Sequence, residues 1–202
     1  LNYQPHELPQ NLKEKTTRLI NMVKLGKVLT DPTMSPSIDA LFVYNANPAV
    51  TIPNQNLVSE GLKRTDLLTV VLAHFVTDTA RYADYVFPAT TPFENWDLFS
   101  TWAIPYLNIN EPAIPPLGEA KANTEFFRLL AKHMGYEESY LFEDDQDLVK
   151  TTLDSNHPYM KGITYKSLRK TGWAKFNLPD PWMPHVEGNF STPTKKCLFY
   201  NP

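Results

Sequence analysis

The chain has 202 residues, a formal net charge of −3 and a single cysteine, and its acidic and basic residues are mixed along its length. This charge balance gives no support for binding to nucleic acid, which attracts strongly basic surfaces. One cysteine excludes a disulfide within the chain and any metal site that needs several thiolates from it. No apolar run approaches the roughly 20 residues that a membrane-spanning helix needs.

The first 37 residues predict a lead-in to the main domain. Residues 11–24 carry apolar side chains at helical spacing among basic ones, which is typical of an amphipathic helix, and Gly26 is expected to end that helix. The chain starts with Leu1 rather than methionine, so we expect an internal piece of a longer protein. The 18 prolines against 7 glycines favour a domain with long, ordered, proline-rich loops.

The next stretch predicts the unit around which the fold is built. Two apolar runs, residues 40–44 and 67–72, have the length and the Val, Leu and Phe content of strands buried on both faces. Residues 53–64 between them begin with a proline and have helical spacing, so the three segments form a βαβ unit with parallel strands. Residues 85–87 follow as a short third strand. The predicted fold class is α/β, with a Rossmann-like parallel sheet and flanking helices over residues 38–172.

Polar side chains gather where the first two predicted strands end. Ligands of such sheets bind beyond the carboxyl ends of the strands, which lie at one edge. In the helical turn that follows the second strand, backbone amides favour an anion, whereas the acidic Asp78 suits a base or a ribose. The simpler alternative is that Thr77 and Asp78 only cap this turn. The candidate site residues at these two strand ends are Asn45, Asn47, Ala73, His74, Thr77, Asp78 and Thr79.

The second half of the chain shows weaker patterns. Residues 90–110 are rich in aromatic side chains, which are predicted to fill the core beneath a long irregular loop. Asn123 predicts the N-cap of a helix that ends at Gly135, and two weaker helices are expected at residues 144–153 and 164–170.

The sequence also predicts roles for single residues around and after the third strand. Asp84 is expected to bind backbone amides at the start of that strand. Glu94 and Asn95 follow the strand, and one role open to Glu94 is to bridge loops. Residues 173–202 are predicted to be a proline-rich linker that ends in the first strand of another element, with Cys197 buried there as a small apolar side chain.

Six segments of the chain match one family in order and spacing. Residues 77–88, TDTARYADYVFP, with Glu94 after them, resemble the T-x-T-A-x-x-A-D-x-x-L-P…E signature of the molybdopterin oxidoreductases. Phe87 stands where leucine is usual, and Lys195-Lys196 replaces the usual Gly-Lys. From residue 38 to its end, the chain resembles the bis-molybdopterin guanine dinucleotide enzymes of the dimethyl sulfoxide reductase superfamily. The other matching segments are residues 41–48 (LFVYNANP), 118–123 (GEAKAN), 126–131 (FFRLLA), 134–136 (MGY) and 188–200 (GNFSTPTKKCLFY).

The resemblance implies that the chain is an internal fragment of a larger multidomain oxidoreductase. Its parent would carry out two-electron chemistry at a molybdenum centre held by molybdopterin guanine dinucleotide. The molybdenum ligand and a domain with a [4Fe–4S] cluster would lie upstream, so the fragment alone is expected to be inactive. The expected partners are the guanine dinucleotide cofactor, the remaining domains of the parent and an electron-transfer subunit, with no nucleic acid and no direct membrane insertion. The compartment stays open, because an export signal would precede Leu1.

The resemblance also assigns cofactor contacts to single positions. The family uses an asparagine at the turn that holds Asn47, and it contacts the nucleotide at the end of the second strand. Many members carry an acid at the position of Ala73, where alanine can contact a ligand only through its backbone. The residues that the resemblance places near the cofactor are Asn47, Leu72, Ala73, His74, Glu94, Asn95 and Asn123.

Two other interpretations stay open. The large iron–sulfur subunit of respiratory complex I has a related domain that serves as a scaffold without molybdenum, and it would be expected to lose the polar residues that this chain keeps. An unrelated α/β small-molecule binding module would require the motif agreement to be a coincidence. The chain has no G-x-G-x-x-G loop, which disfavours a nicotinamide site, and its five histidines show no metal-ligand spacing.

Overall fold

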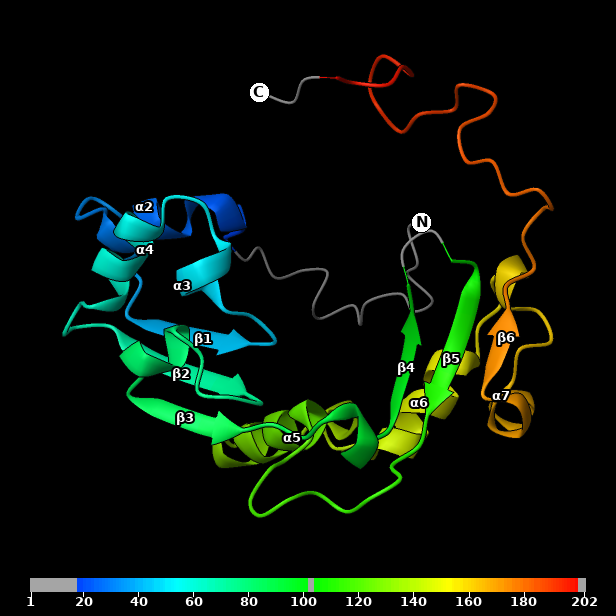
Figure 1. The fold of residues 1–202 in the computed structure, drawn as a ribbon, viewed down its shortest axis with the longest axis horizontal. Coiled ribbons are helices and arrows are strands. Elements are labelled where there is room, and N and C mark those ends of the chain that lie inside the picture. The colour runs from blue at the N-terminus through cyan, green and yellow to red at the C-terminus, as the bar shows by residue number, and fades with distance from the viewer. Residues whose placement is uncertain (1–17, 102–103, 200–202) are drawn as a thin grey trace.

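The computed structural model describes residues 18–101 and 104–199, and Figure 1 shows two lobes, each built on a three-stranded sheet. In the first lobe, β1 (Ala40–Tyr44), β2 (Leu68–Ala73) and β3 (Tyr85–Pro88) form a parallel sheet in the order β1-β2-β3. This confirms the predicted α/β unit and its short third strand. In the second lobe, β4 (Asp97–Ser100), β5 (Tyr106–Asn110) and β6 (Trp173–Lys175) form an antiparallel sheet, which was not predicted.

Helices complete both lobes. In Figure 1, α2 and α4 lie over one side of the parallel sheet, α5 lies beneath the sheet, and α6 and α7 belong to the second lobe. Residues 176–199 contain no helix or strand and run away from the second lobe as an irregular segment. The α-helices are α2 (Leu25–Thr30), α3 (Pro48–Thr51), α4 (Gln55–Leu62), α5 (Asn123–His133), α6 (Asp145–Leu153) and α7 (Tyr165–Thr171). Short 3-10 helices occupy Met22–Lys24, Thr79–Tyr82, Pro92–Glu94, Ser139–Leu141 and Pro158–Met160.

The upper layer of the first lobe depends on two glycines. Leu29, Val58 and Leu62 pack between α2, α4 and the sheet as part of one buried apolar cluster. A β-carbon on Gly26 would lie 2.8 Å from the Val58 backbone nitrogen, and one on Gly61 would lie 2.4 Å from the Leu29 β-carbon. The prediction that Gly26 ends a helix is therefore wrong, since Gly26 lies inside α2 and permits close helix packing.

The opposite face of the parallel sheet packs on α5 through aromatic rings. The Phe126 ring lies 5.6 Å from Phe42 and 4.9 Å from Phe87, and the Phe127 ring lies 5.2 Å from Tyr44, between ring centroids. These side chains occupy the alternate strand positions that point away from α2 and α4. The helix predicted after residue 123 thus forms the second layer of a helix–sheet–helix sandwich.

Three predicted helices are present, with changes at their ends. Ala122 is the N-cap of α5 and Asn123 is its first helical residue, so the predicted capping role of Asn123 is wrong. Gly135, with φ of 76°, follows the helix in the left-handed conformation that the sequence suggested. Asp144 and Thr164 cap α6 and α7 through bonds from Asp147 N and Ser167 N, which confirms the two weaker predictions.

The aromatic-rich segment differs most from its prediction. Residues 90–110 contain β4 and β5 rather than a long irregular loop. Phe93 and Phe99 are 68% and 46% exposed, so these two rings do not fill a core. The second lobe is instead filled by mainly aliphatic side chains from its strands, helices and loops: Leu107, Val149, Leu153, Met160, Ile163, Leu168 and Phe176.

The two ends of the chain also differ from expectation. Of the predicted helix at residues 11–24, residues 11–17 lie outside the described part, and residues 18–21 are irregular. Residues 198–199 form no strand, and Cys197 is exposed rather than buried, which corrects both predictions for this segment. The predicted domain limits stay a prediction, and β6 pairs with β5 just beyond the limit at residue 172. None of the helices in the described ranges is long and apolar enough to cross a membrane.

Candidate functional site

The register of the parallel sheet brings the predicted strand ends together. Tyr44 pairs with Leu72, and Leu72 pairs with Phe87, so all three strands end at one edge. We call this edge, with the residues that follow each strand, the carboxyl edge. Asn45 turns the chain away from β1 with φ of 53°, a left-handed conformation that asparagine tolerates better than most residues.

Asn47 and Thr79 form the most closely bonded pair at the carboxyl edge. The Thr79 hydroxyl donates to Asn47 Oδ1 at 2.7 Å, and the Thr79 backbone N–H donates to the same oxygen at 3.2 Å. Thr79 Oγ1 also accepts a bond from Ala49 N at 3.1 Å. These bonds join the turn after β1 to the turn after β2. The Asn47 side-chain oxygen accepts two of them, both from Thr79.

Asn45 and Asn123 form a second pair. Asn123 Nδ2 donates to Asn45 Oδ1 at 3.1 Å, which ties the start of α5 to the end of β1. Asn123 Oδ1 is buried and has no hydrogen-bond partner among the described residues. A buried acceptor without a partner is costly, so this atom marks a place where a donor is missing from the chain itself.

The remaining predicted residues of the second turn have different roles. Thr77 Oγ1 accepts a bond from Ala80 N at 3.2 Å, so Thr77 caps the turn. Asp78 is exposed and its side chain does not cap the turn, so its carboxylate faces solvent. Ala73 pairs with Pro88 and accepts a bond from Ala89 N, and His74 is exposed with its ring edge-on to Phe75 at 6.3 Å.

Asn95 and Glu94 act inside the loop after β3. Asn95 Oδ1 accepts from the Thr90 hydroxyl at 3.2 Å, and Asn95 Nδ2 donates to Trp96 O at 3.1 Å, so both ends of this side chain are bonded locally. Glu94 is buried and accepts bonds from Thr91 N at 2.7 Å, from the Thr91 hydroxyl at 2.8 Å and from Leu117 N at 2.6 Å. Among the alternatives for Glu94, the structure therefore favours the bridge between loops.

The electrostatic state of Glu94 follows from these bonds. The Thr91 backbone N–H, followed by the Thr91 hydroxyl and the Leu117 N–H, lowers the pKa of the Glu94 carboxyl below its usual value. The imidazole of His74 contributes in the same direction to the pKa of Glu94. Asp84 similarly accepts from Thr69 N at 2.7 Å, which confirms its predicted structural role at the start of β3.

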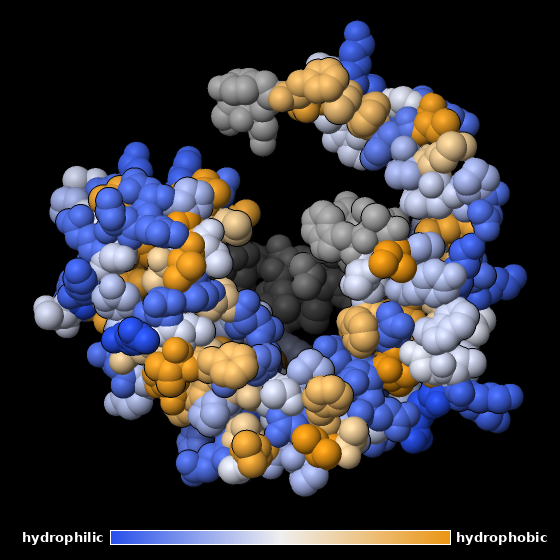
Figure 2. All heavy atoms as spheres, in the orientation of Figure 1, coloured by the Kyte–Doolittle hydropathy of each residue, from blue (hydrophilic) through white to orange (hydrophobic). Residues whose placement is uncertain are grey.

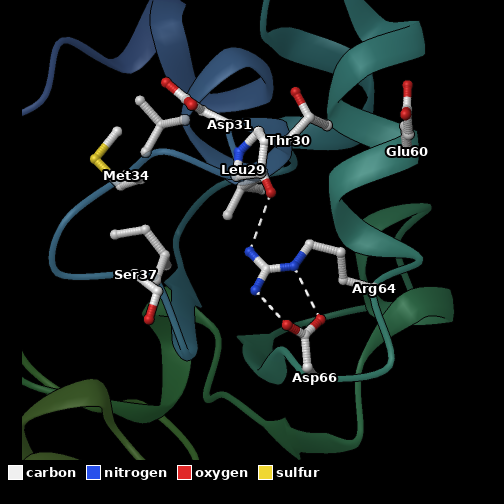
Figure 3. Close-up of a pocket in the computed structure, with 11 residues that line it drawn as sticks. Leu29, Thr30, Asp31, Met34, Ser37, Glu60, Arg64 and Asp66 are labelled. Carbon is white, nitrogen blue, oxygen red and sulfur yellow. Dashed lines mark hydrogen bonds and ion pairs between the residues drawn. The ribbon is translucent and has the colours of Figure 1, made fainter.

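A cavity of the first lobe lies away from the carboxyl edge. It measures about 360 Å³ and is lined at the amino ends of β1 and β2 by residues that include Ser37 and Asp66 (Figure 3). Figure 3 shows Arg64 reaching across it to bind Asp66 and the Leu29 carbonyl, with Arg64 to Asp66 at 2.8 Å and Arg64 to Leu29 O at 3.0 Å. The guanidinium thus serves to close the turn after α4. The described ranges contain no group of three or more side chains suited to holding a metal ion.

The groups present at the carboxyl edge fit a nucleotide. Carboxamides supply both donors and acceptors, as do the edges of a base and the hydroxyls of a ribose. The buried Asn123 Oδ1 needs a donor, and the Asn47 Nδ2 amino group donates to none of the described residues. The carboxyl edge of a parallel α/β sheet is the place where ligands of such folds bind.

The chain belongs to the molybdopterin oxidoreductase family, whose sequence model matches residues 11–133. It is 42% identical over 194 residues to the probable oxidoreductase YoaE of Bacillus subtilis (strain 168), covering 96% of this chain and 28% of that protein. It is 31% identical over 169 residues to acetylene hydratase of Syntrophotalea acetylenica, covering 81% of this chain and 22% of the hydratase. The chain therefore spans about a quarter of the length of these relatives.

A solved structure supports the same assignment. Acetylene hydratase from Pelobacter acetylenicus superposes with a TM-score of 0.64 at 28% identity, covering 87% of this chain and 23% of that chain. The fold class predicted from the sequence is thereby confirmed, as is the resemblance to this family. Other relatives are named as formate dehydrogenases and as the catalytic subunit of an assimilatory nitrate reductase. Because one relative is a hydratase and others are redox enzymes, membership alone does not set the reaction.

Proposed function

We propose that this chain is the nucleotide-binding part of a larger molybdenum oxidoreductase. Its share is to hold one guanine nucleotide of a bis-molybdopterin guanine dinucleotide cofactor at the carboxyl edge. The observation that carries the proposal is the buried Asn123 Oδ1, which has no partner although Asn123 Nδ2 is bonded to Asn45. A ligand N–H or O–H at this place removes the cost of the unpaired acceptor.

The chemistry of guanosine matches the other groups at the edge. Guanine offers an O6 acceptor and N1–H and N2 donors, and the ribose offers hydroxyls that do both. Asn47 Nδ2 can serve an acceptor, and the exposed Asp78 carboxylate can serve donors of the base or ribose. The α5 helix has 11 residues, and its first-turn amides, which lack acceptors within the helix, begin beside Asn45 and suit phosphate oxygens.

The cofactor would supply the two-electron chemistry, and the residues of this chain would bind and orient it. Asn45 and Asn123 hold the start of α5 against the end of β1, while Thr79 holds the turn that carries Asn47. Ala73 contributes only backbone at the end of β2. The proposal places the molybdenum ligand and the [4Fe–4S] cluster elsewhere in the parent protein, so the chain alone is expected to be inactive.

The surface of the first lobe supports a role within a larger protein. Parallel sheets normally have both faces covered. In this chain the edge strand β3 exposes Tyr85 by 59% and Val86 by 43%, and Tyr44 on β1 is 49% exposed. Figure 2 shows hydrophobic side chains among hydrophilic ones on the lobe at the left. We propose that other domains of the parent cover these side chains, and that an electron-transfer subunit is a further partner.

Metal and nucleotide analysis of the full-length parent tests the proposal. The protein is expressed in a host that makes the molybdenum cofactor and is purified without denaturation. We expect about two guanine nucleotides per molybdenum, released on acid treatment, as a bis-dinucleotide centre requires. A parent with neither molybdenum nor guanine nucleotide would contradict the proposal and favour the scaffold related to complex I.

A pair of variants assigns the nucleotide to this chain. Asn123→Ala removes both the bond to Asn45 and the unpaired acceptor, and we expect it to lower the guanine content of the purified protein. His133→Ala, at the exposed far end of the same helix, is the matched control and should keep the wild-type content. Equal nucleotide content in both variants would place the nucleotide at another site.

A further inference from the structure

Thr79 is an unusual residue for a turn at a ligand-binding edge, because it is fully buried. Its relative exposure is 0%, whereas Asp78 before it is exposed. Its hydroxyl is already bonded twice, since it donates to Asn47 Oδ1 at 2.7 Å and accepts from Ala49 N at 3.1 Å. A side chain in this position does not reach a ligand directly, but it can decide how its neighbour does.

The two hydrogen-bond donors of Thr79 determine the orientation of the Asn47 carboxamide, that is, which side carries its oxygen and which its amino group. The Thr79 backbone N–H is an obligate donor, and it points at the same Asn47 atom as the hydroxyl, at 3.2 Å. That atom must therefore be the oxygen, because an amino group there would face a donor. The Asn47 Nδ2 amino group is turned away from Thr79, and it donates to none of the described residues. Asn47 accordingly presents only donors to anything bound at the carboxyl edge.

We propose that Thr79 is a positioning residue that holds Asn47 as a fixed donor toward an oxygen acceptor of the bound guanine nucleotide. This inference rests on the proposed function, since it names how that site recognises its ligand. The acceptor is a phosphate oxygen, a ribose oxygen or a base carbonyl such as guanine O6. A group that presents an N–H at this place, such as the amino group of adenine, meets a second donor and is rejected.

The chain offers a matched control for the hydroxyl of Thr79. Thr69 on β2 is also buried, at 1% exposure, but its Oγ1 has no hydrogen-bond partner among the described residues. Thr69→Val and Thr79→Val make the same chemical change in the same lobe. Only the second change removes a bond to Asn47, so a difference between them reports on that bond.

The experiment uses the full-length parent and measures guanine nucleotide per chain and its rate of release, with the Tm recorded for every variant. We expect Thr79→Val to speed release by about tenfold, the value of one lost hydrogen bond that orients a ligand group. Thr79→Ser keeps the hydroxyl and should restore release to near the wild-type rate, and Thr69→Val should match wild type. Asn47→Asp, which replaces the donor by an acceptor, should lose at least as much nucleotide as Thr79→Val.

A double-variant cycle separates positioning from a plain structural role. If Thr79 acts through Asn47, then Thr79→Val adds no further loss once Asn47→Ala is present. Three results would overturn the inference and leave the proposed function intact. Thr79→Val could release the nucleotide no faster than Thr69→Val, Asn47→Asp could retain the full nucleotide content, or the losses of nucleotide in the cycle could be additive. A wild-type parent without guanine nucleotide would overturn the proposed function, and the inference with it.

Discussion

Replacing Gly61 by alanine should destabilise the first lobe even though alanine favours helices. A β-carbon at this position lies 2.4 Å from the Leu29 β-carbon, whereas ordinary contact begins at 3.4 Å, so α2 and α4 must separate by about 1.0 Å (3.4 − 2.4). The Leu29 β-carbon is attached to the backbone of α2, so a change of rotamer cannot relieve this contact.

The size of the effect follows from two opposing terms. Overpacking of a tight core costs typically about 1–3 kcal/mol, and a contact with a main-chain-linked atom lies at the upper end. The gain in helix propensity from glycine to alanine is about 1 kcal/mol. The expected net loss is therefore about 2 kcal/mol, which lowers Tm by about 4–8 °C for a chain of this size.

Thermal unfolding followed by circular dichroism measures this loss. Asn56→Ala, at an exposed position of the same helix, is the control and should leave Tm unchanged or raise it slightly. Leu29→Ala should not rescue Gly61→Ala, because the clashing β-carbon remains. A Tm for Gly61→Ala at or above that of the wild type would refute the idea that this glycine sets the approach of α2 to α4.

Three further changes test other contacts. The pKa of Glu94 is lowered in the folded state, so its contribution is complete above the unfolded value of about 4.3 and is lost as the pH falls through the folded value. Urea unfolding should show Glu94→Gln less stable than wild type at pH 7, with a gap that closes in acid; a constant gap would contradict this. Asp84→Ala, which removes the acceptor for Thr69 N, should cost about 1–2 kcal/mol in the same assay, whereas Asp84→Asn should cost less. Arg128 donates to Asp145 at 2.8 Å, so Arg128→Ala should cost about 1–2 kcal/mol, and an unchanged unfolding midpoint would show that this pair is dispensable.

The first lobe was predictable because its signals are local and strong. Runs of Val, Leu and Phe at residues 40–44 and 67–72 have the length and composition of strands, and a βαβ connection fixes their direction. The burial predicted for both faces is wrong in part, because Phe42, Tyr44 and Leu68 are 36%, 49% and 46% exposed. The position of the candidate site followed from the same rule, since parallel strands end at one edge. Asn45 and Asn47 were therefore assigned to the correct edge without knowledge of the rest of the chain.

The missed features depend on residues far apart in sequence. The Asn47–Thr79 bond joins positions 32 residues apart, and no local pattern distinguishes Thr79 from its exposed neighbour Asp78. The second sheet was missed because β6 joins β5 from Trp173 onward, long after Asn110. Gly26 suggested a helix end by composition, but its small size instead serves helix packing, which only the tertiary structure shows.

The hydrogen bonds of Glu94 separate the segment that contains β4 and β5 from the parallel sheet of the first lobe, and this separation bears on how the chain can evolve. The chain leaves the parallel sheet after Pro88 and contacts its last strand again at Lys121. Between these points Glu94 Oε1 accepts from Leu117 N, and Ala113 N donates to Phe93 O at 2.8 Å, so the two ends of the intervening segment are joined. A segment whose two ends are held together by hydrogen bonds can change in sequence at little cost to the elements that precede and follow it, because its ends are already closed. Substitutions within β4 and β5 therefore act on the second sheet and its core, which contains Leu107, while the strand ends of the parallel sheet keep their geometry.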